Sequence, residues 1–150
     1  MASAREKALK EFQRYRRYVC SDASGHASCI SCGKIELVSR MDGGHYESRK
    51  TRITEMEPDN VWAQCKYCNG PLSGNHIAYR SRLLSRIGPV RLERIENLVM
   101  ASKGSEEALS RLPENDKKAI GIKRKDKEYL ELAKHYKKLA DTLAKEKCIA

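Results

Sequence analysis

Cys29-Ile-Ser-Cys32 and Cys65-Lys-Tyr-Cys68 are the two segments of this sequence that decide its fold. Four thiolates at this spacing suit one tetrahedral zinc ion, because each short segment can present both of its sulfur atoms to the same metal. Such a site has no open coordination position, so we expect one structural zinc ion per chain, which stabilises the fold. A redox role for either cysteine pair is the alternative.

Composition points to a polyanionic partner. The chain has 150 residues and a formal net charge of +10, which favours nucleic acid as the partner, although a basic surface can also serve solubility alone. Residues 1–20 are charged throughout, and no apolar run approaches the roughly 20 residues that span a bilayer. We therefore expect no signal peptide, no membrane partner and a cytosolic location. Cys20 and Cys148 lie outside the two pairs and are expected to be incidental thiols.

Hydrophobic periodicity predicts helices near both ends of the chain. Ala8, Phe12 and Tyr15 recur at helical spacing within residues 3–19. A similar apolar stripe runs through residues 126–147, and we favour packing of this helix on its own domain over a dimer seam. The basic side chains of the first helix are either a solvated face or contacts to phosphate groups.

The region between these helices is expected to be mixed. We predict strands over residues 34–40 and 45–46, with a bend or bulge at 42–44, in a hairpin that carries His45. Asn75 should begin a helix that Gly88-Pro89 stops at Ile87, and a second helix and a short helix near Leu112 follow. The predicted loops or linkers are residues 21–28, 47–59 and 113–125.

The expected fold class is α+β, with a small zinc-stabilised ββα-metal core flanked by α-helices. We divide the chain into a basic N-terminal helix (1–20), a four-cysteine core with its following helices (21–104), and a linker with the C-terminal helix (105–150).

Polar residues between and after the cysteine pairs indicate hydrolytic chemistry on a phosphodiester. A neutral imidazole with a pKa of about 6.5, such as that of His45, is a suitable general base for water at neutral pH. Asn69, directly after Cys68, has an amide oxygen that a hard divalent cation accepts as a ligand.

These residues resemble a known family. Gly44-His45, Asn60 and Cys68-Asn69 resemble the HNH (His-Me finger) endonucleases, in a version whose last His is replaced by Asn directly after the last zinc cysteine, as in endonuclease VII. More closely, Cys-Ile-Ser-Cys-Gly, Asp-x-Gly-His-Tyr and Asn-x-x-x-Gln-Cys-x-x-Cys-Asn resemble the NinG/Rap recombination proteins of lambdoid phages. The resemblance runs from about residue 5 to residue 100.

The resemblance implies a phage-encoded, structure-selective endonuclease that cleaves branched DNA, such as Holliday junctions and D-loops, in the cytoplasm of the host cell. It implies that His45 is the general base, that Asn69 is a ligand of catalytic Mg²⁺ or Mn²⁺, and that Asn60 braces the loop and fixes the His45 backbone.

Gly44 departs from the HNH pattern, since many of these enzymes place a metal-binding Asp or His directly before the base. Residues 42 and 44 of an extended strand point to the same face, so Asp42 is the candidate second ligand unless a bulge at Gly43-Gly44 breaks the alternation.

Clustered basic side chains are candidate phosphate contacts that do not read sequence. The candidates are Arg49, Lys50, Arg52, Lys66, Arg80, Arg82 and Arg86. His76 is either an extra ligand or phosphate contact near the cleft, or a surface residue.

Two other functions are compatible with the sequence. One is a non-catalytic zinc-containing DNA-binding protein that assists recombination, and the other is a protein-interaction adaptor. Neither needs His45 together with Asn69. Because symmetric junction cleavage needs two cuts, a two-fold homodimer is a further hypothesis.

Overall fold

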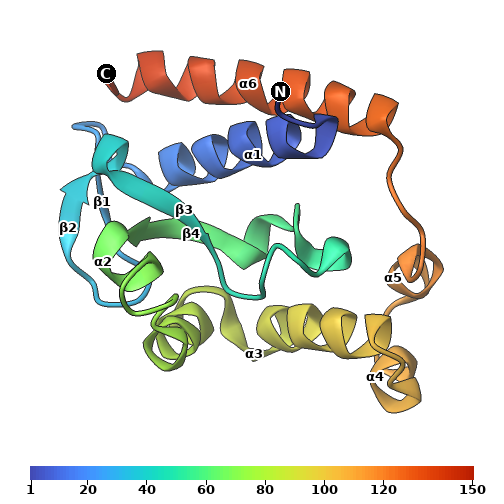
Figure 1. Cartoon of the computed structure of the whole chain (residues 1–150). Coiled ribbons are helices and arrows are strands. Elements are labelled where there is room, and N and C mark those ends of the chain that lie inside the picture. The colour runs from blue at the N-terminus through green and yellow to red at the C-terminus, as the bar shows by residue number, and fades with distance from the viewer.

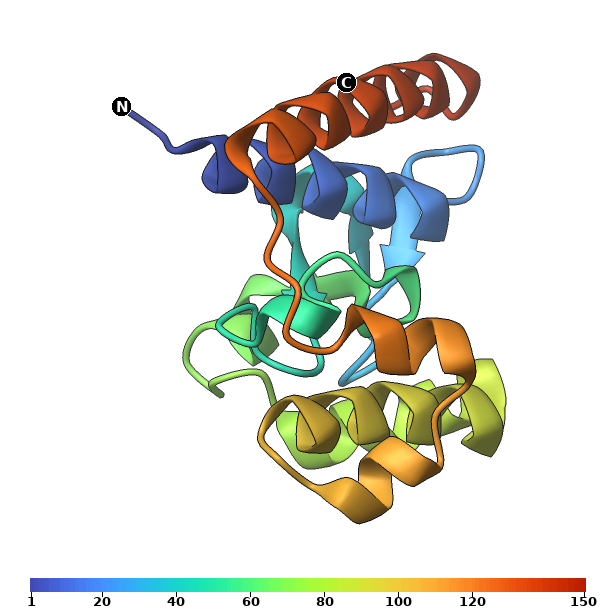
Figure 2. The ribbon, with the colours of Figure 1, turned by 90° about the vertical axis from the view of Figure 1, so that its right-hand side faces the viewer.

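Two helices from opposite ends of the chain, α1 (Ala4–Cys20) and α6 (Asp126–Glu146), pack along one another on one side of a small sheet (Figure 1). This computed structural model describes all 150 residues. On the other side of the sheet lies α3 (His76–Ser102), with α4 (Glu106–Ser110) and α5 (Glu114–Ala119) beside it (Figure 2). The molecule therefore consists of helical layers on either side of a central region of two small two-stranded sheets, and the α+β class is confirmed.

The α1 helix begins with a capping box. The Ser3 hydroxyl accepts a hydrogen bond from the Glu6 N–H, and the Glu6 carboxylate accepts one from the Ser3 N–H. Its apolar stripe is buried, with Phe12 in edge contact with Tyr136 of α6 at a ring separation of 4.8 Å. The predicted helices at both ends are confirmed, and the stripe of α6 packs on α1.

Two antiparallel strand pairs form the sheet region. β1 (His26–Ser28) pairs with β2 (Ile35–Leu37), and β3 (Met41–His45) pairs with β4 (Val61–Cys65). The short helix α2 (Lys66–Asn69) follows β4 directly.

The register of β3 on β4 corrects the predicted hairpin. Every residue of β3 has a partner, from Met41 opposite Cys65 to His45 opposite Val61, so the expected bulge at 42–44 is absent. The strand of His45 pairs with residues 61–65 and not with 34–40. Residues 34–40 form only the short strand β2 and a 3₁₀ turn, Val38–Arg40, because their hydrogen-bonding partner is the three-residue strand β1 within the predicted loop 21–28.

The break predicted in the middle of α3 is confirmed. Gly88 has φ +82°, a conformation that favours glycine, and Pro89 begins the second helical segment. Tyr79 and Leu83 before the break and Leu92 and Ile95 after it are buried in one cluster with Trp62. The predicted short helix exists as α4, whereas the predicted linker 113–125 is partly wrong, because residues 114–119 form α5.

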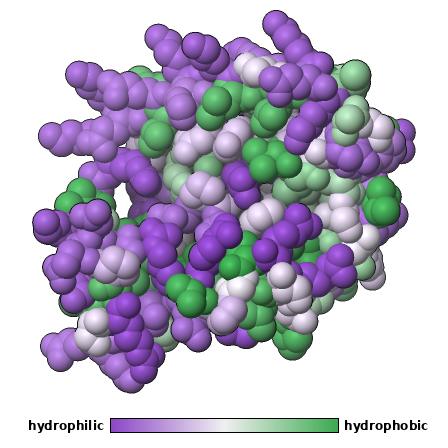
Figure 3. Space-filling model, turned by 180° about the vertical axis from the view of Figure 1, so that it is seen from behind, coloured by the Kyte–Doolittle hydropathy of each residue, from purple (hydrophilic) through white to green (hydrophobic).

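The face seen from behind is mixed in character: hydrophilic side chains dominate its top and left, and hydrophobic ones occur among them in the middle and at the right (Figure 3). None of the helices combines the length and the apolar character that crossing a bilayer requires.

Candidate metal centre and catalytic cleft

The four cysteines of the two pairs converge as the sequence predicts. Their sulfur atoms lie within 4.8 Å of one another, and the Sγ atoms of Cys32 and Cys65 are 3.8 Å apart. A tetrahedral zinc ion with Zn–S distances of about 2.3 Å has sulfur–sulfur edges of about 3.8 Å. Cys29, Cys65 and Cys68 are buried, and Cys32 is exposed. The cluster can therefore hold a metal ion such as zinc.

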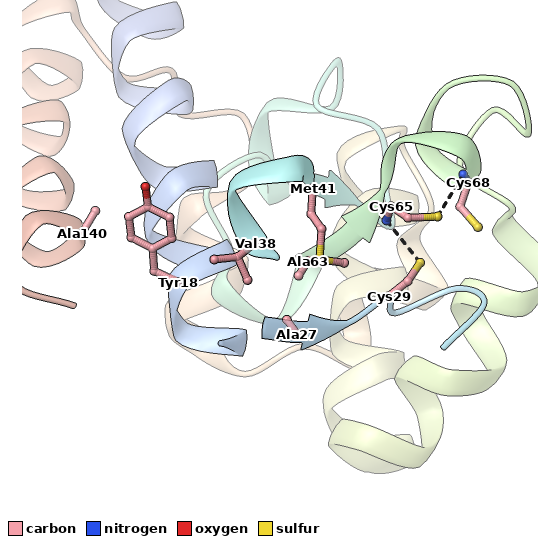
Figure 4. Packing of buried hydrophobic residues seen from close by; sticks show 9 residues of the cluster. All are labelled: Tyr18, Ala27, Cys29, Val38, Met41, Ala63, Cys65, Cys68 and Ala140. Atoms are coloured by element: carbon pink, nitrogen blue, oxygen red, sulfur yellow. Dashed lines mark hydrogen bonds between the residues drawn. The ribbon is translucent and has the colours of Figure 1, made fainter. Parts of the chain in front are cut away.

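Backbone N–H groups surround these sulfur atoms. The Cys29 Sγ accepts a hydrogen bond from the Ser31 N–H at 3.4 Å. It also accepts one from the Cys65 N–H at 3.3 Å, and the Cys68 N–H donates to the Cys65 Sγ at 3.4 Å (Figure 4). Burial raises the pKa of the Cys29 thiol, but the N–H donors outweigh it, so that the pKa lies below its usual value. N–H donors thus favour the thiolate form that a metal requires at Cys29, whereas burial raises the pKa of the Cys65 and Cys68 thiols above the usual value.

The cluster fixes the start of α2 against the sheet. The N–H of Ile30, inside the first cysteine pair, donates to the Ala63 carbonyl of β4 at 2.9 Å. Cys65 ends β4 and Cys68 lies within α2, so a shared metal would connect strand and helix. Asn69 is the last residue of α2 and is therefore placed by the second cysteine pair.

His45 lies at the end of β3 with one ring nitrogen already used. Its Nε2 is 2.8 Å from the carbonyl oxygen of Glu55. A carbonyl oxygen only accepts hydrogen bonds, so Nε2 carries the proton and Nδ1 of the neutral ring has a free lone pair. Burial lowers the pKa of His45, although the Glu55 carbonyl opposes the shift. The ring is therefore neutral, and Nδ1 can accept a proton at neutral pH.

Asp42 and Asn69 come together at the other end of β3. The Asn69 Nδ2 donates to the Asp42 Oδ2 at 2.9 Å, and the Lys66 Nζ donates to the Asp42 Oδ1 at 2.8 Å. Partial burial opposes the charge of Asp42, but the bonds from Lys66 and Asn69 hold its pKa below the usual value. The Asn69 amide therefore lies against the Asp42 carboxylate, and its Oδ1 has no hydrogen-bond donor in the protein.

His45 and Asp42 open into one cleft. Alternation along an unbroken strand sends their side chains to opposite faces of β3. The cavity at His45 and the cavity at Asp42 nevertheless share Gln13, Gly43 and Asn69 as lining residues. Gly43 has no side chain to separate them, so the two cavities adjoin and form the two parts of one candidate cleft.

The lack of space beside Gly44 explains why this position of β3 carries no metal-binding side chain. A Cβ at Gly44 would lie 1.9 Å from the Gln64 Oε1, and the Gly44 carbonyl accepts a hydrogen bond from the buried Tyr79 hydroxyl at 2.7 Å. Any side chain would displace the buried Gln64. Asp42 is therefore the carboxylate that β3 offers to the cleft.

Asn60 closes the loop that carries Glu55. Its side chain is buried, accepts from the Glu47 N–H at 2.7 Å, and donates to the carbonyls of Glu47 and Thr54 at 3.0 and 2.9 Å. Its own carbonyl accepts from the Tyr46 N–H at 2.9 Å. Asn60 thus fixes both the residue after His45 and the residue before Glu55.

Glu55 is a residue that sequence reasoning missed. Its carboxylate is fully buried, pairs with Arg5 at 2.7 Å and with Arg124 at 3.3 Å, and accepts from the Tyr129 hydroxyl. These partners come from α1, from the segment before α6, and from α6. A single Glu in a polar loop carries no local signal of such a network.

Comparison with known proteins assigns the chain to a family. Residues 2–138 match the family described as "Bacteriophage Lambda NinG protein". The chain belongs to the NinG family. It is 38% identical over 73 residues to "Protein ninG" of Escherichia phage lambda, and 36% identical over 70 residues to the proteins of that name from Escherichia phage 933W and Salmonella phage P22. Each match covers 46% of this chain and 34% of the relative, so the aligned segment spans about a third of those proteins. No solved structure matches.

The candidate phosphate contacts of this NinG-family chain do not all face the cleft. Arg49 lines both of its cavities, and Lys66 pairs with Asp42 there. Arg80 is paired with Glu96, and Arg82 and Arg86 line a separate cavity beside the first cysteine pair. Lys50 and Arg52 line yet another cavity.

The α1 helix contributes cleft residues that were not among the site residues predicted from the sequence. Lys10, Gln13 and Arg17 line the cavity at Asp42 and Asn69. Their spacing of three and four residues puts them on one face of α1, and this spacing could have singled them out. His76 lines the cavity at His45 and stacks on Tyr46, with ring centroids 4.5 Å apart.

We predict that the purified protein holds about one zinc ion per chain and that Cys65→Ser lowers this content sharply, because three sulfur ligands leave the tetrahedral site incomplete. Metal analysis measures the content, and thermal unfolding with and without a chelator measures the stability that the metal supplies. Cys148→Ser, outside the cluster, is the control. A Cys65→Ser chain with a full complement of zinc would contradict the four-cysteine site.

Proposed function

We propose that this chain is a metal-dependent endonuclease that cleaves branched DNA during phage recombination. The observation that carries the proposal is the pair of adjoining cavities, one lined by His45 with its free Nδ1 and the other by Asp42, with Asn69 lining both. Arg49, Lys10 and Arg17 line the same cleft and supply positive charge for a phosphate group. The choice of branched DNA rests on the resemblance to NinG/Rap recombination proteins.

His45 is the general base in this proposal. Its Nδ1 accepts a proton from a water molecule, which then attacks the phosphorus atom, while the Glu55 carbonyl keeps the ring in the required tautomer and orientation. Asn60 acts as a positioning residue, because it fixes the loop from which that carbonyl comes. Arg49 neutralises charge on the phosphate that enters the cleft.

The donor set at the other end of the cleft fits a hard divalent cation. Asp42 and Asn69 would hold Mg²⁺ or Mn²⁺ through oxygen atoms, and the ion would stabilise negative charge on the phosphate and on the departing oxygen. The Lys66 ammonium group, 2.8 Å from the Asp42 Oδ1, places a positive charge beside this carboxylate, as a bound metal ion would.

The strands β3 and β4 with helix α2 then form the ββα-metal core of an HNH (His-Me finger) nuclease, and zinc at the four cysteines is its structural metal. A two-fold dimer on the junction remains part of the proposal. Because α1 covers the apolar stripe of α6, such a dimer would use another surface. We expect the protein to act in the cytoplasm of the host cell.

Replacement of the base tests the proposal directly. With Mg²⁺ or Mn²⁺, the wild-type chain should nick a synthetic four-way junction, and His45→Ala should slow cleavage by about 10²–10⁴-fold, the typical contribution of a positioned base. Junction binding should be retained. The control is His26→Ala, which removes a histidine of β1 outside the cleft.

Equal cleavage by wild type and His45→Ala would contradict the role of His45. Junction binding by both chains without cleavage by either would contradict the nuclease. That second result would support the non-catalytic DNA-binding protein instead.

The pH dependence of cleavage should report the pKa of His45. Burial lowers this pKa below its usual value of 6.5, so the neutral base is already present at pH 6.5 and is lost only as the pH falls further. We predict that kcat/KM falls tenfold per pH unit on an acidic limb whose midpoint lies below pH 6.5. The same limb should be missing from the residual activity of His45→Ala, and its persistence there would assign it to another group.

Asp42→Asn should weaken the catalytic metal. The substitution keeps the shape of the side chain and removes its charge, so the Mg²⁺ concentration for half-maximal cleavage should rise by about tenfold or more. A metal titration of junction cleavage measures the effect. Glu36→Gln is the control. Glu36 lies on β2, outside the cleft, and its carboxylate is paired with Lys34. An unchanged midpoint for Asp42→Asn would exclude Asp42 as a ligand.

A further inference from the structure

A separate cavity of about 330 Å³, outside the cleft, is lined by basic side chains from three distant segments of the chain. Lys50 and Arg52 come from the loop after β3, Lys103 follows α3, and Lys123 lies between α5 and α6. The hydroxyl-bearing residues Thr51 and Ser102 complete its polar lining, and no acidic residue lines it.

None of these four cationic side chains forms an ion pair. Elsewhere in the protein Arg80, Arg91 and Arg94 are each paired with a carboxylate within 4.0 Å. Four like charges around one cavity repel each other, and this repulsion is relieved when an anion enters. The cavity is therefore complementary to a negatively charged ligand.

The position of Lys123 is fixed by its neighbours. Arg124 pairs with the buried carboxylate of Glu55, and the Tyr129 hydroxyl bonds to the same carboxylate. Figure 2 shows the segment between α5 and α6 running past the loop of residues 46–60 on its way to α6. The cavity wall is thus part of the packed structure rather than a free chain end.

The basic cavity adjoins the catalytic cleft. Lys50 follows Arg49, which lines the cleft at both His45 and Asp42. Two basic residues in succession, Arg49 and Lys50, therefore connect the cleft with the basic cavity.

We propose that the cavity formed by Lys50, Arg52, Lys103 and Lys123 binds the phosphate backbone of the DNA arm that leads away from the cleaved phosphate. This inference takes the position of the DNA from the proposed function. The complementarity of the cavity to a phosphate group does not depend on that function. Lysine and arginine contacts to phosphate fix the register of DNA without reading its sequence, which suits an enzyme that recognises branches.

The test is the salt dependence of junction binding by a Lys103→Gln, Lys123→Gln double variant. Both side chains are exposed and unpaired, so the fold should be unchanged, and circular dichroism checks this. The measurement uses the full chain in the His45→Ala background without added divalent metal, so that cleavage does not interfere. The control is Lys134→Gln, Lys138→Gln, which removes the same charge from exposed, unpaired positions of α6.

Loss of two phosphate contacts should reduce the slope of log K against log salt by about 1.8, since each contact to duplex DNA contributes about 0.9. The control should keep the wild-type slope. Equal slopes for the two double variants would overturn the inference, even if wild type cleaves junctions. A reduced slope for Lys103→Gln, Lys123→Gln alone would support it, even if wild type proves to bind without cleaving.

Discussion

The close approach of backbone atoms at Gly43 and Gly44 is the constraint on which the site depends. A Cβ at Gly43 would lie 2.6 Å from the Gln13 carbonyl oxygen of α1, and a Cβ at Gly44 would meet Gln64. Without these side chains, Gln13 donates to the Gly43 carbonyl at 2.8 Å, and Tyr79 of α3 donates to the Gly44 carbonyl at 2.7 Å. The strand that ends in His45 is therefore held by a helix on each side.

The buried carboxylate of Glu55 extends this constraint to both ends of the chain. A carboxylate without partners in the interior would be strongly destabilising, so Arg5 and Arg124 must be in place when the loop of residues 46–60 closes. The same residue supplies the carbonyl that orients His45. Assembly of α1, α6 and the loop is thus coupled to the geometry of the candidate base.

The features that could be predicted from the sequence are those with a local cause. The cysteine pairs converge because ligand chemistry requires it, the end helices follow from periodicity, and the break at Gly88-Pro89 follows from backbone conformation. The errors concern short elements, β1 and α5, which show no periodic pattern, and pairings decided by tertiary structure. Glu55 meets partners 50 and 69 residues away, and no local pattern marks such contacts.

The structural metal and the catalytic cleft are connected through α2. This helix has only four residues, too few to be stable alone, because helix nucleation fixes several residues for a single hydrogen bond. Its conformation rests on Cys65 and Cys68, with the Cys65 Sγ capping its first turn through the Cys68 N–H at 3.4 Å. Asn69 follows immediately and reaches Asp42 at 2.9 Å. In the proposed enzyme, zinc therefore takes no part in the reaction, yet it determines where the amide oxygen of Asn69 lies.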